Sequence, residues 1–151
     1  VLHDGRVLAQ QRAYPPEAAG RWELPGGRVE PGESARHALV RECREELAVD
    51  VVPAEQLGAD VPLPDGSVLR VYVARLADPT AQPVPVEHTA LRWVGTAELA
   101  DLDWLPPDRT LLPDLAREAA TSIHVALNAG PKGATSIHVA TGDKERADAD
   151  E

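Results

Sequence analysis

Three carboxylates on one predicted helix are the side chains of this sequence whose spacing best suits chemistry. Residues 41–46 read Arg-Glu-Cys-Arg-Glu-Glu. Residues three and four apart are neighbours on one helix face, so Glu42 lies beside Glu45 and Glu46, and Arg41 reaches Glu45. A divalent cation would relieve the repulsion among these carboxylates, because Mg²⁺ prefers hard oxygen ligands. In isolation, however, the pattern is typical of a solvent-exposed helix face with one Arg–Glu pair.

The surrounding residues 27–49 extend this pattern into a longer motif. Its form is G-x5-E-x7-R-E-U-x-E-E-x-G-U, where U is an aliphatic or similarly apolar residue. Only Ala48 departs, since it stands where the pattern has glycine. The motif resembles the Nudix box, the signature of hydrolases that cleave a nucleoside diphosphate linked to another group. The matching residues are Gly27, Glu33, Arg41, Glu42, Cys43, Glu45, Glu46 and Val49.

The resemblance covers roughly residues 1–118 and implies the fold. We expect an α/β (α+β) protein with the Nudix fold, an α/β/α sandwich with a mixed sheet and the box as a loop–helix–loop. Residues 1–120 are expected to form this domain. The family carries a longer first strand before the Asp4-Gly5 turn, so the first strand is interpreted as truncated, and the chain begins at Val1 without a methionine.

Sequence patterns place the elements that would carry the motif. A helix after the N-cap Ser34 has an apolar stripe of Ala35, Ala38, Leu39, Cys43 and Leu47. Ala48 stands near its end, where glycine would adopt the left-handed conformation easily. Either Ala48 holds that conformation at a cost of about 1 kcal/mol, or the helix ends differently. Other expected elements are a turn at 3–6, strands at 7–12, 22–24, 49–57, 68–76 and 90–94, and helices at 96–102 and 111–120.

The resemblance is strongest to the small MutT-type nucleoside triphosphate pyrophosphohydrolases. It rests on residues 20–27, residues 91–94 and the region of Asp108. Similar enzymes act on CTP, dCTP or oxidised deoxynucleotides such as 8-oxo-dGTP, which implies a role in nucleotide pool sanitation and DNA repair. The expected products are a nucleoside monophosphate and pyrophosphate.

By this resemblance, Mg²⁺, or Mn²⁺ in its place, would be held by the carbonyl of Gly26 and by Glu42, Glu45 and Glu46. Arg41 would orient a glutamate through a charge-assisted bond. The catalytic residues implied are Glu45, Glu42, Arg41 and Glu87. Glu87, from the loop before residues 90–94, would complete the metal site or act as base. A solvated loop glutamate is the alternative at that position.

The same resemblance assigns substrate binding and box structure. Arg12 would bind phosphate, and Leu24 is assigned to the substrate site. Asp108 would read the base edge, because a carboxylate accepts hydrogen bonds from the exocyclic amino group of cytosine. Its alternative role is a partner for the dipole of the following helix. Gly27 and Glu33 would be structural, with Glu33 ordering the loop.

Composition limits the partners and the compartment. The chain has 151 residues and a net charge of −10, which argues against binding long nucleic acid through its phosphates. It has no run of apolar residues long enough for a membrane span. Its single cysteine, Cys43, excludes an internal disulfide and is expected in the core. We expect a cytoplasmic monomer or homodimer acting on a small nucleotide.

Residues 121–151 form an atypical tail. The hexapeptide Thr-Ser-Ile-His-Val-Ala occurs at 121–126 and again at 135–140, and the end from Lys144 to Glu151 is charged and expected to be disordered. A duplication, fusion scar or frameshifted end would explain the repeat. Another hypothesis is that one Ile-His-Val segment docks as a strand in the place of the truncated first strand.

Three other functional interpretations remain open. One is a Nudix enzyme for another diphosphate such as ADP-ribose, because Pro64 falls where that branch carries a proline, although a turn at residues 63–67 also explains it. Another is a non-catalytic nucleotide-binding module, against which the intact Glu42, Glu45 and Glu46 argue. The last is a damaged or chimeric chain that folds poorly.

Overall fold

A tight hairpin begins the fold. Asp4 and Gly5 both have positive φ angles, 49° and 71°, as two-residue turns between twisted antiparallel strands require. The turn joins β1 (Leu2–His3) to β2 (Arg6–Gln11). In the computed structural model, which describes residues 1–129 and 137–142, β2 also pairs antiparallel with β3 (Trp22–Glu23) and β7 (Ala90–Gly95). We call these four strands the hairpin sheet.

A second sheet of the described residues has the order β4-β8-β6-β5. It comprises β4 (Gly26–Arg28), β8 (Ile137–Gly142), β6 (Val68–Leu76) and β5 (Val51–Pro62). The β4–β8 pair is parallel, whereas β8–β6 and β6–β5 are antiparallel. We therefore call it the mixed sheet. Because β4 contains Gly26 and Gly27, the mixed sheet directly supports the loop that precedes the Nudix-like helix.

Helix α1 (Ala35–Leu47) carries the three glutamates of the motif. The Ser34 side chain accepts a hydrogen bond from the backbone N–H of His37 and caps the helix, as predicted. Four residues of the predicted stripe, Ala38, Leu39, Cys43 and Leu47, are buried, whereas Ala35 in the first turn is only partly buried. The opposite side of α1 presents its polar residues to solvent and to the site.

The end of α1 is a left-handed cap at Ala48, with φ 56° and ψ 34°. Its backbone N–H donates to the carbonyl of Arg44 at 3.2 Å, which satisfies a carbonyl that the helix leaves without a partner. The left-handed cap is one of the two helix endings expected from the Nudix-like pattern, which has glycine at the position. The side chain of Ala48 is exposed.

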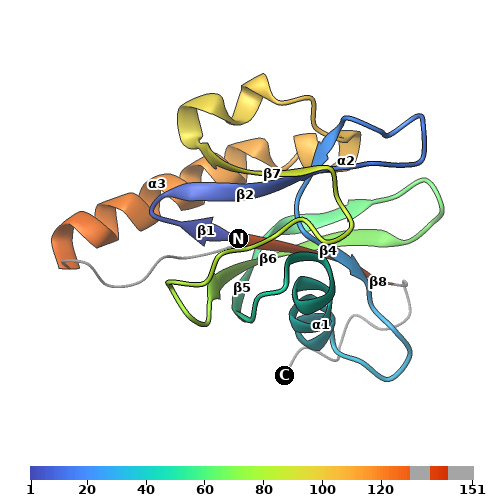
Figure 1. Ribbon diagram of the computed structural model, residues 1–151, viewed down its shortest axis with the longest axis horizontal. Coiled ribbons are helices and arrows are strands. Elements are labelled where there is room, and N and C mark those ends of the chain that lie inside the picture. The colour runs from blue at the N-terminus through green and yellow to red at the C-terminus, as the bar shows by residue number, and fades with distance from the viewer. Residues whose placement is uncertain (130–136, 143–151) are drawn as a thin grey trace.

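Residues 96–129 form helical elements on the other side of the molecule (Figure 1). They are the 3-10 helix η1 (Thr96–Asp101), the short helix α2 (Pro106–Arg109) and the long helix α3 (Leu112–Ala129). The helix expected at 111–120 is longer than predicted, since α3 continues to Ala129, nine residues further. The first copy of the repeated hexapeptide, residues 121–126, lies within this extension.

The second copy of the hexapeptide has a different conformation. Residues 137–140 belong to β8, which lies between β4 and β6. Its register pairs Gly26 with Val139 and Tyr72 with His138. The predicted disorder at 144–151 concerns positions outside the described residues.

Alternation along the strands divides the core into two layers. Val7 and Ala9 of β2 belong to a cluster with residues of η1 and α3, whereas Leu8 belongs to a cluster with Cys43 and Leu47 of α1. The two sheets thus form a central layer between α1 and α3, an α/β/α arrangement. Among the residues that the structure describes, no helix has the length and apolar character that crossing a membrane requires.

Candidate active site

Arg41 connects three glutamates of the motif in one polar cluster. The Arg41 guanidinium donates to Glu33 Oε1 at 2.8 Å and to Glu42 Oε1 at 2.8 Å, and it lies 3.5 Å from Glu45 Oε2. Hydrogen bonding by Arg41 lowers the pKa of the Glu33 carboxyl below its usual range. Arg41 also donates to the carbonyl of Arg28, so it ties α1 to the end of β4.

Gly27 leaves the space that the Glu42 carboxylate occupies. A Cβ atom added at Gly27 would lie 2.2 Å from Glu42 Cδ, far inside van der Waals contact. The Glu42 side chain is only 14% exposed. Glycine is therefore needed at this position for close approach of β4 and α1.

Glu46 points in another direction, toward β2. Its Oε2 accepts from Gln10 Nε2 at 3.0 Å and from the backbone N–H of Gly26 at 3.4 Å. Burial raises the pKa of the Glu46 carboxyl to about 7, partly opposed by the hydrogen bond from Gln10. Glu45 is the most exposed of the three glutamates, at 57%.

These three carboxylates do not converge on one point. Within residues 1–129 and 137–142, no group of three or more acidic, histidine or cysteine side chains is close enough to hold a metal ion by itself. Because like charges repel, Glu42 turns to Arg41 and Glu46 turns to Gln10. The sequence prediction that Glu42 sits beside both other glutamates holds for the helix face but not for the carboxylate groups.

Glu23 joins the phosphate-binding candidate Arg12 to the rest of the site. Its carboxylate accepts from Arg12 NH1 at 3.1 and 3.2 Å, from Gln10 Nε2 at 3.5 Å and lies 2.9 Å from His88 Nε2. A carboxylate is an acceptor only, so Nε2 of His88 carries the proton in this contact. Arg12 is also held by its Nε, which donates to the carbonyl of Tyr14.

Asp108 lies beside Leu24, the residue that follows Glu23. Segment 103–105 pairs with Trp22, since Leu105 N–H donates to the Trp22 carbonyl at 2.8 Å, and this brings α2 beside Leu24. Asp108 Oδ1 accepts from the backbone N–H of Leu24 at 2.9 Å. The side chain is buried, and burial raises the pKa of its carboxyl to about 7.

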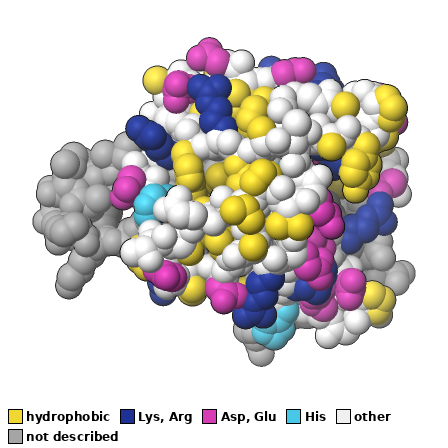
Figure 2. Space-filling model, viewed as in Figure 1, with side chains coloured by type: hydrophobic (Ala, Val, Ile, Leu, Met, Phe, Trp, Pro, Cys, Tyr) yellow, Lys and Arg dark blue, Asp and Glu magenta, His cyan; other side chains and the backbone are white. Residues whose placement is uncertain are grey.

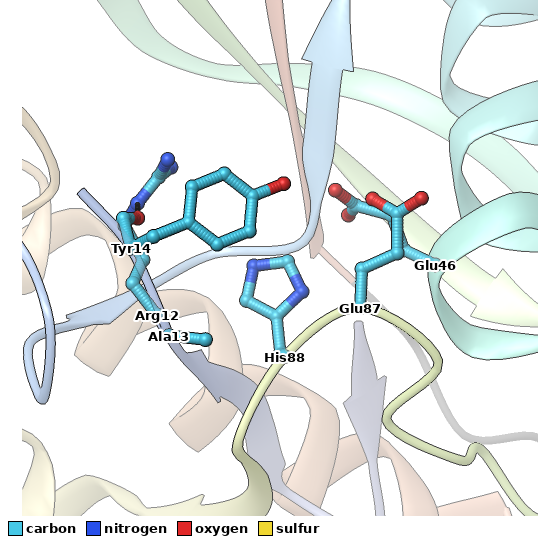
Figure 3. Close-up of a pocket in the computed structure, with 6 residues that line it drawn as sticks. All are labelled: Arg12, Ala13, Tyr14, Glu46, Glu87 and His88. Atoms are coloured by element: carbon cyan, nitrogen blue, oxygen red, sulfur yellow. Dashed lines mark hydrogen bonds between the residues drawn. The ribbon is translucent and has the colours of Figure 1, made fainter.

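Two cavities meet at Arg12 and Glu46. The larger, about 280 Å³, is lined by Gly26, Glu46, Leu24 and Asp108 among others. The smaller, about 60 Å³, is shown in Figure 3, where Tyr14 and His88 face the carboxylates of Glu46 and Glu87. Tyr14, which lines it, is 64% exposed, and Val84 and Val86 of the loop that carries Glu87 are exposed apolar side chains as well. Figure 2 shows apolar side chains spread over one face of the molecule, with acidic side chains beside them.

The structure brings together most of the predicted site residues. Gly26, Glu46, Arg12, Leu24 and Asp108 line the larger cavity, while Glu87 joins Arg12 and Glu46 at the smaller one. Gly27 also lines the larger cavity, beside the cluster of Glu33, Arg41 and Glu42. Glu45 lines neither.

Sequence reasoning missed Gln10, Glu23 and His88. Gln10 is fully buried within a strand whose neighbours Val7, Leu8 and Ala9 are also buried, so no alternation distinguishes it. Glu23 and His88 adjoin the predicted Leu24 and Glu87. A charged residue next to each predicted site residue was the available signal.

Comparisons with known proteins identify the family of the chain. A family described as "NUDIX domain" matches residues 1–115. The chain is 45% identical over 130 residues to a Mycobacterium tuberculosis protein named "Putative 8-oxo-dGTP diphosphatase 2", covering 82% of this chain and 91% of that one. It is 36% identical over 112 residues to the "CTP pyrophosphohydrolase" of Escherichia coli K12, covering 74% and 83%.

A solved structure gives the same result for the fold. The crystal structure of a MutT NUDIX hydrolase from Burkholderia pseudomallei superposes with a TM-score of 0.59 at 32% identity, covering 76% of this chain and 91% of that one. The expected fold class is therefore confirmed.

Proposed function

Because this chain belongs to the NUDIX family and is a Nudix hydrolase, we propose that it hydrolyses a nucleoside triphosphate, in a reaction that requires Mg²⁺, to a nucleoside monophosphate and pyrophosphate. The observation that carries this proposal is the larger cavity. Arg12, Gly26 and Glu46 line it together with Leu24 and the buried Asp108. A nucleotide needs both kinds of lining, charged and oxygen-bearing groups for its phosphate chain and its metal, and a largely apolar wall with a polar group for its base.

The donor set suits a hard divalent cation. Glu42, Glu45, Glu46 and the carbonyl of Gly26 offer only oxygen ligands, and Mg²⁺ commonly takes a few such ligands together with waters and substrate phosphates. Gly27 has no side chain where the Glu42 carboxylate lies, which leaves room for that ligand. When bound, Mg²⁺ would neutralise phosphate charge and lower the pKa of a coordinated water.

The chain's own residues supply orientation and charge. Arg12, fixed by Glu23 and the Tyr14 carbonyl, would bind a phosphate oxygen. Arg41 would hold Glu42 in place from the side away from substrate. Glu87 lines the smaller cavity with Glu46, and we propose that it serves as the base or as a further ligand.

Asp108 is proposed to select the base. Its Oδ1 accepts from the N–H of Leu24, and the residue lines the larger cavity, where its carboxyl would meet the base. As a carboxylate it accepts from an exocyclic amino group such as that of cytosine. With its pKa raised to about 7, its protonated form would instead donate to a carbonyl oxygen. CTP, dCTP and oxidised deoxynucleotides such as 8-oxo-dGTP are therefore the proposed substrates, and the proposed role is nucleotide pool sanitation in the cytoplasm by a monomer or homodimer.

The test is pyrophosphate release from CTP, dCTP, 8-oxo-dGTP and dGTP, with AMP release from ADP-ribose measured alongside. We expect release from one or two triphosphates, dependence on Mg²⁺, and a loss of about 100-fold or more in kcat for Glu46→Gln. Glu55→Gln is the matched control, since Glu55 is exposed on β5 away from both cavities. Turnover of ADP-ribose alone, or full activity of Glu46→Gln, would contradict the proposal.

A further inference from the structure

His88 reaches the site through a loop that is fixed at three points. The backbone N–H of Val84 donates to the carbonyl of Leu47, and that of Val86 to the carbonyl of Glu46, both at 3.0 Å. Past His88, the N–H of Thr89 donates to the carbonyl of Gln11 at 2.9 Å. The loop is thus tied to the end of α1 and to β2, so the position of His88 is set by the backbone on both sides.

His88 makes one polar contact in the described structure, and it is with Glu23. The His88 side chain is only 9% exposed, and its Nδ1 is buried with no hydrogen-bond partner among the described residues. The contact of Nε2 with Glu23 Oε1 therefore accounts for its polar role. Glu23 Oε1 also accepts a hydrogen bond from Gln10 Nε2, and the same Nε2 donates to Glu46 Oε2.

We propose that His88 is a positioning residue that acts through Glu23 to orient Arg12 toward a substrate phosphate. Arg12 has two fixed contacts, its Nε with the Tyr14 carbonyl and its NH1 with Glu23. The first fixes the stem of the guanidinium, and the second fixes its rotation. Without His88, Glu23 loses the hydrogen-bond donor that lies 2.9 Å from its Oε1. The Glu23 carboxylate can then rotate, and Arg12, which is bound to it, moves away from the position that faces the phosphate. The inference rests on the proposed function, because it assigns Arg12 a phosphate.

The first experiment measures pyrophosphate affinity in the presence of Mg²⁺, together with kcat and KM for the triphosphate that the wild-type protein hydrolyses. His88→Leu removes the donor, and His88→Gln retains an N–H donor of similar reach. We expect about tenfold weaker pyrophosphate binding and a raised KM with little change in kcat for His88→Leu. His88→Gln should stay within about threefold of wild type. The control is His37→Leu, since His37 is exposed on α1.

A double-mutant cycle with Arg12→Ala separates positioning from a merely structural effect. If His88 acts through Arg12, His88→Leu should weaken pyrophosphate binding by less than about twofold in the Arg12→Ala background. An undiminished effect in that background would overturn the inference, as would equal losses in His88→Leu and His88→Gln, or no difference between His88→Leu and the control. If no triphosphate is hydrolysed, the proposed function fails, but the pyrophosphate cycle still decides the role of His88.

Discussion

Replacing Ala48 with glycine should stabilise this protein without changing its activity. Ala48 holds φ 56° and ψ 34°, a conformation in which an L-residue with a Cβ is strained by about 1–2 kcal/mol. Its methyl group is exposed, so removing it loses little packing. Glycine, however, gains freedom in the unfolded chain, which offsets about 0.4–1 kcal/mol of the benefit. The net expectation is an increase of about 0.5–1 kcal/mol in the free energy of unfolding.

The assay is thermal unfolding followed by circular dichroism, together with urea unfolding to give the free energy directly. For a chain of this size, each kcal/mol shifts Tm by about 2–4 °C, so we expect a rise of about 1–4 °C. Ala120→Gly is the matched control, because Ala120 is exposed within α3 and the same change there should lower stability by about 1 kcal/mol. A fall in Tm for Ala48→Gly, or a shift of the same sign in both variants, would refute the argument.

Three further predictions concern the site and the sheet. In Asp108→Asn, the amide oxygen should keep the hydrogen bond from the N–H of Leu24, so the NH₂ group should face the ligand. The ratio of kcat/KM for CTP to kcat/KM for 8-oxo-dGTP should then fall by about tenfold. An unchanged ratio would show that Asp108 does not select the base. Because the pKa of Glu46 is raised to about 7, protons should compete with Mg²⁺ for this carboxylate below pH 7. Without metal, the contribution of Glu46 to the free energy of unfolding should decline as pH rises from the usual carboxyl range through 7, because the folded protein holds the proton more tightly than the unfolded chain. Mg²⁺ should therefore raise Tm more at pH 8 than at pH 6, and equal shifts would contradict this. Deleting residues 130–151 removes β8 from between β4 and β6, so Tm should fall; an unchanged Tm would show that the strand contributes nothing to stability.

Local signals predicted the motif helix and its caps. Ser34, the apolar stripe and Ala48 all act within a few residues of the backbone they stabilise, which is why sequence alone placed α1. Glu46 was likewise predicted from the continuous motif, and Gly26 from its place directly before that motif by family resemblance; both line the larger cavity.

The network around Glu23 could not be predicted in this way. Glu23 and His88 are 65 residues apart in sequence, and Gln10 and Glu46 are 36 apart. Their contacts exist only because β2 pairs with β3 and because the loop before β7 is tied to α1. No spacing rule within one element relates such residues, so only the folded arrangement shows that they act together.

The repeated hexapeptide shows where conformational information resides in this chain. Its first copy is helical within α3, and four residues of its second copy form a strand in β8. Six identical residues cannot encode both outcomes, so the difference comes from their surroundings, the preceding turns of α3 in one case and the open backbone groups of β4 and β6 in the other. The position between β4 and β6 therefore favours a strand through the backbone hydrogen bonds that its two neighbours offer. A transplanted segment of different sequence but high β-propensity should also form a strand there.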